Sequence, residues 1–140
     1  MKAIVQERYG SPDVLELREI DRPNVEDDEV LVRVRAASVH ADVWHALHGV
    51  PYVLRIMGSG LRAPKHHVPG TDLAGQVESV GRNVTRFRPG DEVFGQTLTA
   101  NLWRNGGAYA EYATAPETGL ELKPDLLTFG KKMQICGILA

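Results

Sequence analysis

The sequence predicts a mostly β protein built of short antiparallel strands, and two observations predict this fold class. Leu73, Gly75 and Val77 take alternate positions, which is the period of a strand with one buried face. Pro89-Gly90-Asp91 then gives a strong turn signal, because proline presets φ at one central position and glycine supplies φ > 0 at the next. Residues 92–95 start another strand, so we expect a tightly turned antiparallel pair.

The residues before this pair predict three more strands. Residues 3–5 and 15–18 are short β runs separated by turn residues, and they are expected to pair as a hairpin. Alternating apolar and charged residues over 30–36 predict a longer strand. The acidic residues 26–29 between them are expected to form a solvated turn.

A short helix is expected after the long strand. Asp42 is a candidate N-cap, since its carboxylate could accept hydrogen bonds from amides of the first turn. Val43 and Leu47 lie four residues apart and would face the core. Gly49 would end the helix.

Residues 50–68 form a long loop with an unusual apolar content, which we expect to pack on the protein or to line a pocket. Residues 58–63 in this loop fit the dinucleotide-binding spacing G-x-G-x-x-A. We reject this motif because Pro64 would break the helix that it needs. Downstream, residues 106–113 and 120–124 predict two further strands.

The composition indicates one globular domain and excludes two classes of partner. The chain has 140 residues, of which 43% are hydrophobic and 24% charged, so it can bury a core. Its net charge of −2 argues against a nucleic acid or an anionic membrane as the partner. The sequence has no apolar run that approaches a membrane span, and its one cysteine, Cys136, permits a reducing compartment. We therefore expect a cytoplasmic protein.

Three segments carry a resemblance to a known family. PGTDLAG at residues 69–75, Val80-Gly81, and PGDEVFG at residues 89–95 resemble the signature of the medium-chain dehydrogenase/reductase superfamily, specifically its zinc-independent, quinone-oxidoreductase-like branch. This resemblance implies that residues 1–128 form the GroES-like (alcohol dehydrogenase N-terminal) domain, a partly open β-barrel with short helices. Residues 129–140 would begin a linker helix toward a cofactor domain.

The resemblance also implies a C-terminal Rossmann domain that holds a nicotinamide dinucleotide. The 140 residues contain no credible glycine-rich turn between a strand and a helix, which such a domain needs for the cofactor's phosphates. We therefore expect the Rossmann domain to be absent from this chain and NADPH to bind only in a complete two-domain protein. The cofactor-binding residues stay unknown.

The resemblance argues against a catalytic zinc. Zinc-dependent members place a cysteine where His40 stands, a histidine where Thr71 stands, and a third ligand that Cys136 would match. His40 and Cys136 could bind a metal and Asp72 only conceivably, but a threonine does not complete a tetrahedral set of cysteine, histidine and carboxylate ligands.

The family pattern suggests four site residues. His40 occupies the cleft position that relatives fill with a metal ligand or an amide, so it is the candidate proton donor or oxyanion partner. Asp42 stands where some relatives place a proton-relay hydroxyl; a helix cap is the alternative. Trp44 and Tyr52 are candidate substrate-pocket residues, with core packing as the alternative for each.

Together these observations predict the substrate-side domain of an NAD(P)H-dependent oxidoreductase that reduces quinones, enones or other reactive carbonyls. Such a domain would be inactive alone. The formation of a homodimer is a further possibility. The alternative is a non-catalytic β-domain that binds proteins or associates with itself through its apolar loop. A chaperonin-like ring subunit is a third reading, and it would need a mobile glycine-rich loop.

Overall fold

The computed structural model describes all residues except 40, 54, 57–59, 65–66, 99–106 and 125–140. Within the described part the chain is mostly β, which confirms the predicted fold class. The strands and the α-helix are β1 (Lys2–Gln6), β2 (Leu15–Glu19), β3 (Glu29–Ala37), α1 (Ala41–His48), β4 (Asp72–Val80), β5 (Glu92–Gln96), β6 (Tyr112–Pro116) and β7 (Leu120–Leu122). None of the helices described is long and apolar enough to cross a membrane.

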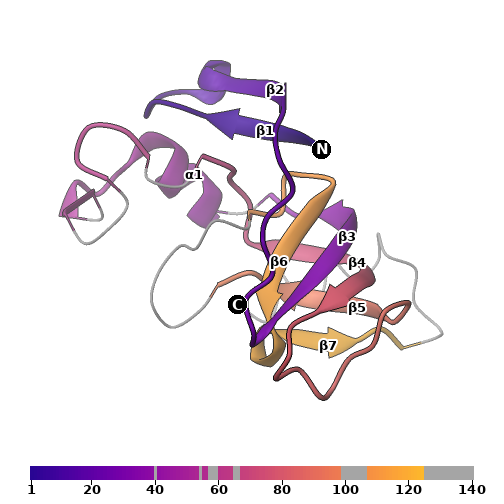
Figure 1. The fold of residues 1–140 in the computed structure, drawn as a ribbon. Helices are drawn as coiled ribbons and strands as arrows, with labels where there is room; N and C mark the ends of the chain where they lie inside the picture. The colour runs from indigo at the N-terminus through magenta and orange to yellow at the C-terminus, as the bar shows by residue number, and fades with distance from the viewer. Residues whose placement is uncertain (40, 54, 57–59, 65–66, 99–106, 125–140) are drawn as a thin grey trace.

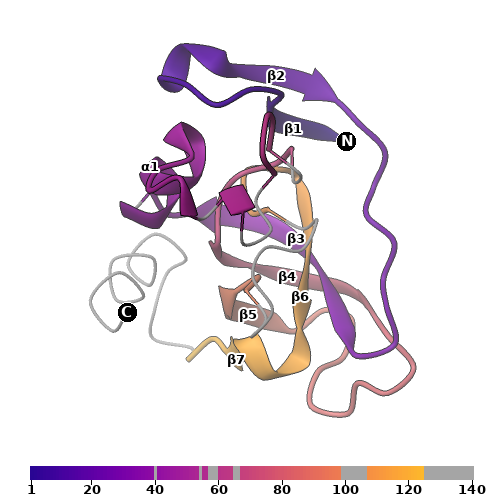
Figure 2. The same cartoon turned by 90° about the vertical axis from the view of Figure 1, so that its left-hand side faces the viewer.

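The strands form two antiparallel sheets. The larger sheet has five strands in the order β6-β3-β4-β5-β7, and β1 pairs with β2 in a separate hairpin. Figure 1 shows the hairpin at one end of the molecule and α1 beside it, with the larger sheet below them. In the view turned by 90°, α1 lies between the hairpin and the edge of the sheet (Figure 2).

The predicted strand pair around the Pro-Gly turn is confirmed. β4 pairs with β5 from Asp72 opposite Gln96 to Gln76 opposite Glu92. Gly90 has a φ of 100°, which an L side chain rarely adopts, so this turn needs glycine. Leu73 and Val77 on β4 are both buried, as their alternation predicted, but Asp72 and Ala74 are buried too, so the first half of β4 is buried on both faces and the prediction of one buried face is wrong there.

The core fills the space against the central strands of the larger sheet. Its fully or almost fully buried members are Val30, Val32, Leu73, Val77, Phe87, Val93, Ala108, Ala113, Ala115 and Leu120. These residues come from five strands and from two connecting segments. Burying apolar side chains that run from Val30 to Leu120 along the chain holds the five strands together around one core.

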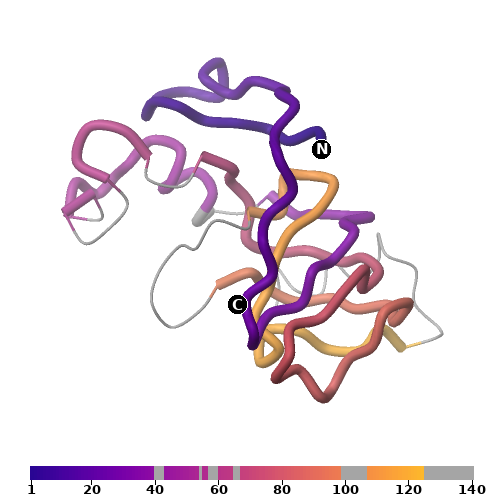
Figure 3. Tube along the Cα trace, viewed as in Figure 1, coloured from indigo at the N-terminus to yellow at the C-terminus, as the bar shows by residue number. Residues whose placement is uncertain are grey.

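The N-terminal hairpin is tied to distant segments by backbone hydrogen bonds. The Ile4 amide donates to the Tyr109 carbonyl at 2.8 Å, and the Gln6 amide donates to the His67 carbonyl at 2.7 Å. From β2 the chain then runs along the molecule to the start of β3 (Figure 3). These two bonds therefore hold β1 against His67 and Tyr109.

The structure confirms most of the features predicted for helix α1. Val43 and Leu47 are buried, and Gly49 follows the helix with a φ of 62°. The helix begins at Ala41, however, so Asp42 lies in its first turn and the prediction of an Asp42 N-cap is wrong. Negative charge in the first turn still interacts favourably with the helix dipole.

Two other expectations are corrected. The strand predicted over 106–113 is instead β6, which starts at Tyr112 and continues to Pro116. The acidic residues 26–29 are not simply a solvated turn, because Glu29 is buried at the start of β3 and Asp27 forms an ion pair with Arg82 at 2.9 Å. The expected linker helix over 129–140 lies outside the described residues.

Candidate functional site

A polar cluster around the buried Asp72 lies where β3 ends and β4 begins. Asp72, the first residue of β4, is 1% exposed. The Ser38 hydroxyl donates a hydrogen bond to Asp72 Oδ2 at 2.6 Å, and the Tyr109 hydroxyl donates to the Ser38 carbonyl at 2.8 Å. These bonds link three segments that are far apart in the sequence. We call Ser38, Asp72 and Tyr109 the Ser-Asp-Tyr cluster.

The Pro-Gly pair before β4 makes room for this cluster. Gly70 has a φ of 96°, and a Cβ there would lie 2.6 Å from Cδ1 of Tyr109. The backbone amides of Ala108 and Tyr109 donate to the carbonyls of Gly70 and Pro69. The tyrosine ring can therefore lie directly against the backbone and reach Ser38.

The electrostatics of the cluster favour a neutral tyrosine. Burial raises the pKa of the Tyr109 hydroxyl above its ordinary value of 10.0, and the negative charge of Asp72 raises it further. Tyr109 therefore stays a hydrogen-bond donor at neutral pH. A charge buried as deeply as Asp72 needs such polar neighbours, because its desolvation is otherwise costly.

The cluster lies next to the predicted catalytic residues along the chain. His40 follows Ser38 by two residues but is itself outside the described part of the structure. Asp42 is placed in the first turn of α1, and its side chain is not described. Their catalytic roles stay predictions. Because Ser38 is held through its side chain and its carbonyl, the backbone that leads into this turn is fixed at one end.

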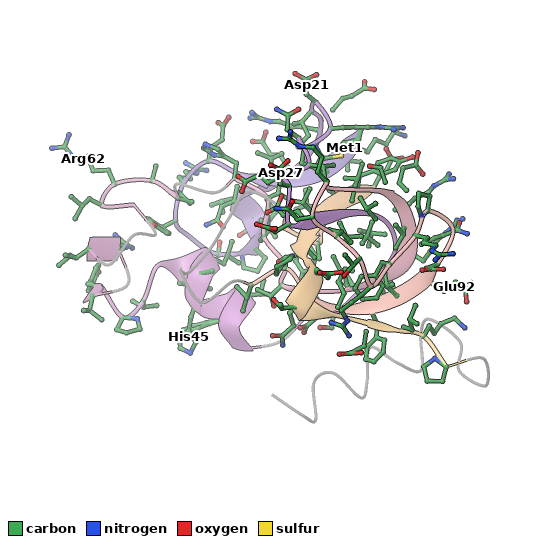
Figure 4. The ribbon with its side chains drawn as sticks, turned by 60° about the horizontal axis from the view of Figure 1, so that its bottom comes forward. Met1, Asp21, Asp27, His45, Arg62 and Glu92 are labelled. Carbon is green, nitrogen blue, oxygen red and sulfur yellow. The ribbon has the colours of Figure 1, made fainter. Side chains whose placement is uncertain are left out.

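The two predicted pocket residues lie on the surface. Trp44 is 52% exposed and Tyr52 is 67% exposed, so the alternative that they are core residues is wrong. The Trp44 ring stacks on His48 with centroids 4.3 Å apart and planes at 29°. His45, the other histidine of α1, points outward in Figure 4 and lies with Nδ1 3.0 Å from the Val50 carbonyl. A pocket role for Trp44 and Tyr52 stays a prediction.

The loop after α1 was expected to pack on the protein or to line a pocket, and the first of these expectations is not met. Ile56 and Leu61 are 74% and 71% exposed, so these side chains do not pack on the described part of the protein. Residues 60–64 contain no helix. They comprise the described end of the rejected dinucleotide motif and the proline that follows it. An exposed apolar loop is available to a ligand or to another polypeptide.

The described residues include neither of the candidate zinc ligands, His40 and Cys136. No group of three or more histidine, cysteine, aspartate or glutamate side chains comes together among the described residues, and Thr71 is buried where a zinc site would need histidine. The connection from β3 to α1 contains no glycine, so it cannot form the glycine-rich turn that holds dinucleotide phosphates. Cys136 lies outside the described residues.

The described part of the fold defines the class of protein as a mostly β domain. The chain belongs to the alcohol dehydrogenase GroES-like domain family, whose model matches residues 26–125. This confirms the resemblance to the N-terminal domain of quinone-oxidoreductase-like members of the medium-chain dehydrogenase/reductase superfamily.

Known relatives agree with this assignment. The chain is 32% identical over 130 residues to the quinone oxidoreductase of Sus scrofa, covering 92% of this chain and 35% of the relative. It is 35% identical over 135 residues to the 2-methylene-furan-3-one reductase of Solanum lycopersicum, covering 94% and 33%. The quinone oxidoreductase structure from Coxiella burnetii superposes with a TM-score of 0.78 at 29% identity, covering 92% and 38%. The chain thus spans about a third of the length of the curated relatives it matches.

Sequence reasoning missed Ser38 and Tyr109. The aspartate of the PGTD segment was the available signal, since a carboxylate beginning a buried strand needs hydrogen-bond donors. Nothing local identifies the donor, because Ser38 and Asp72 are separated by 34 positions.

Proposed function

We propose that this chain is the substrate-side domain of an NAD(P)H-dependent oxidoreductase that reduces quinones, enones or other reactive carbonyls. The similarity over 92% of the chain to a quinone oxidoreductase carries this proposal. Further support comes from a relative in Arabidopsis thaliana named NADPH-dependent alkenal/one oxidoreductase, which is 34% identical over 134 residues. Residues 1–128 would form this domain, and residues 129–140 would lead toward the cofactor domain.

Each site residue has a proposed role. In a two-domain protein, a nicotinamide held outside this domain would supply the hydride. His40 would donate a hydrogen bond or a proton to the substrate oxygen, and Asp42 would relay that proton. Trp44 and Tyr52 would offer flat apolar faces to a planar substrate.

The Ser-Asp-Tyr cluster supports the role of His40 by a physical argument. A proton donor is effective only when it is held within hydrogen-bond reach of the atom it serves. The cluster bonds Ser38 on both its side chain and its backbone, two residues before His40. It would therefore limit the movement of this turn.

The second candidate function is a non-catalytic β-domain that binds other proteins or itself. The exposed apolar side chains Tyr52, Ile56 and Leu61 in one loop favour it. A ring of chaperonin-like subunits would be an extreme form of this self-association. Light scattering during size-exclusion chromatography tests both, since a concentration-independent monomer excludes self-association.

A binding experiment on the 140-residue chain tests the main proposal. We would titrate the chain with tetramethyl-1,4-benzoquinone, whose four methyl groups hinder addition of the Cys136 thiol, and follow the side-chain NMR signals. We expect shifts at Trp44, Tyr52 and His40, and weaker binding in His40→Gln. NADPH followed by calorimetry should not bind below about millimolar, which corresponds to roughly −4 kcal/mol. Absence of quinone binding would contradict the proposal.

Zinc content is measured on the same sample. Stoichiometric zinc would revive His40 and Cys136 as ligands, and micromolar NADPH binding would show that a cofactor site exists within these 140 residues. Either result would require a different account of the site.

A further inference from the structure

One arginine connects the loop after α1 to the helix and to the N-terminal segment. The guanidinium carbon of Arg55 lies 4.2 Å from the ring centroid of Tyr9 and 4.7 Å from that of Tyr52. A guanidinium over an aromatic face is attracted by the negative charge density of the ring. Arg55 therefore contacts the candidate substrate residue Tyr52 and a tyrosine from a different part of the chain.

The same guanidinium caps the C-terminal end of α1. Its Nε donates to the Gly49 carbonyl at 2.9 Å, and one Nη donates to the His48 carbonyl at 3.0 Å. The last carbonyls of a helix have no partner within the helix and carry the negative end of its dipole. Arg55 satisfies two carbonyls at this end and at the same time adds positive charge there.

Gly49 leaves the space that Arg55 and the Tyr9 ring occupy. Gly49 has a φ of 62°, and a Cβ there would lie 2.5 Å from Arg55 Nε and 2.6 Å from Cδ1 of Tyr9. The Tyr9 hydroxyl donates to the Gly60 carbonyl at 2.7 Å. Arg55 and Tyr9 together therefore attach the loop to the protein near its start and near Gly60.

We propose that Arg55 is a positioning residue for the substrate site: it holds the exposed ring of Tyr52 in one place beside the end of α1. This inference rests on the proposed function, in which Tyr52 contacts the substrate. An exposed tyrosine on a loop loses rotational freedom when a ligand orders it, and that loss weakens binding. Because Arg55 already restrains the ring, part of this loss occurs when the chain folds.

Lysine cannot take over this role. Arginine presents planar donors in a fixed fork and stacks on aromatic faces, whereas lysine is a flexible point charge. Arg55→Lys should keep the favourable charge at the end of α1 but lose the fork and the stacking on both rings. This difference separates a positioning role from a general stabilising one.

The experiment compares four chains: the unchanged chain, Arg55→Met, Arg55→Lys and a matched control, Arg62→Met. Arg62 is an exposed arginine of the same loop and projects away from the rest of the molecule (Figure 4). For each chain we would measure the Tm, the nuclear Overhauser contacts between the Tyr52 ring and the side chain at position 55, and the Kd for tetramethyl-1,4-benzoquinone.

We expect Arg55→Met to lose the ring contacts and to raise the Kd by about three- to tenfold, the range for one newly mobile side chain. Arg55→Lys should regain part of the Tm but keep the raised Kd, and Arg62→Met should match the unchanged chain. If Arg55→Met unfolds, Arg55→Lys still tests the ring position.

Two results would overturn the inference, and they differ in what they say of the proposed function. If Arg55 variants bind the quinone as tightly as the unchanged chain with the Tyr52 ring still ordered, the positioning role is wrong while the proposed function stands. If the unchanged chain does not bind the quinone at all, the proposed function fails and the positioning role fails with it.

Discussion

The hydrogen bond between Ser38 and Asp72 gives the sharpest stability prediction. Ser38→Ala removes the hydroxyl that donates to Asp72 Oδ2 at 2.6 Å, and it adds no bulk. The acceptor is 1% exposed, so water cannot replace the lost donor without rearrangement. A hydrogen bond to a charged group contributes about 1.5–3 kcal/mol, and we therefore expect a loss of about 2 kcal/mol.

A second serine supplies the matched control. Ser11 Oγ donates to Asp13 Oδ2 at 3.0 Å, but this pair is exposed. Ser11→Ala should change the free energy of unfolding by less than about 0.5 kcal/mol, because water replaces an exposed hydrogen bond easily. The two variants remove the same chemical group and differ in burial.

Urea unfolding followed by circular dichroism gives the free energy of unfolding of both variants, and thermal unfolding gives their Tm. At roughly 4 °C of Tm per kcal/mol for a chain of this size, Ser38→Ala should lower the Tm by about 8 °C. Adding Asp72→Asn gives a double-mutant cycle, in which the two substitutions together should cost less than the sum of their separate effects. Equal losses in the Ser38 and Ser11 variants would show that burial of Asp72 does not strengthen this bond.

Three further predictions concern other residues. The pKa of Tyr109 is raised, so its contribution to stability is complete below about pH 10 and is lost as the pH rises further. In Tyr109→Phe the free energy of unfolding should therefore fall less steeply with pH above about pH 10. The amides of Arg86 and Thr85 lower the pKa of Glu117, whose contribution is present above about pH 4.5 and is lost below it; Glu117→Gln should flatten the acid side of the profile. Gly75→Ala would place a Cβ 2.2 Å from the Arg33 carbonyl and should cost about 1–3 kcal/mol in urea unfolding, with an unchanged stability refuting that contact.

Local patterns were sufficient where one element decides its own structure. The β4–β5 pair followed from alternation and a Pro-Gly turn, and α1 followed from the spacing of Val43 and Leu47. The long strand β3 was also predicted from its alternation alone. In these elements the side-chain period and the turn residues agree with the tertiary structure.

The remaining features depend on partners that are distant in the sequence. The strand predicted over 106–113 begins only at Tyr112, and just before it the amides of Ala108 and Tyr109 donate to the carbonyls of Gly70 and Pro69. Ser38 and Tyr109 were missed for the same reason, since they meet across 71 positions. The contact between Arg55 and Tyr9 was also missed, because Tyr9 precedes Arg55 by 46 positions. Periodicity reports local geometry, and these contacts are set by packing.

The order of strands in the larger sheet has a consequence for how the chain folds. β3 pairs on one side with β4 and on the other with β6, whose residues 112–116 come about 80 positions later. During synthesis this second edge of β3 has no partner until β6 has left the ribosome. Sheets with such distant pairings fold slowly, on the order of milliseconds to seconds. An early chain therefore exposes an open strand edge of unpaired N–H and C=O groups, and chaperone binding or dilution should raise the yield of folded protein.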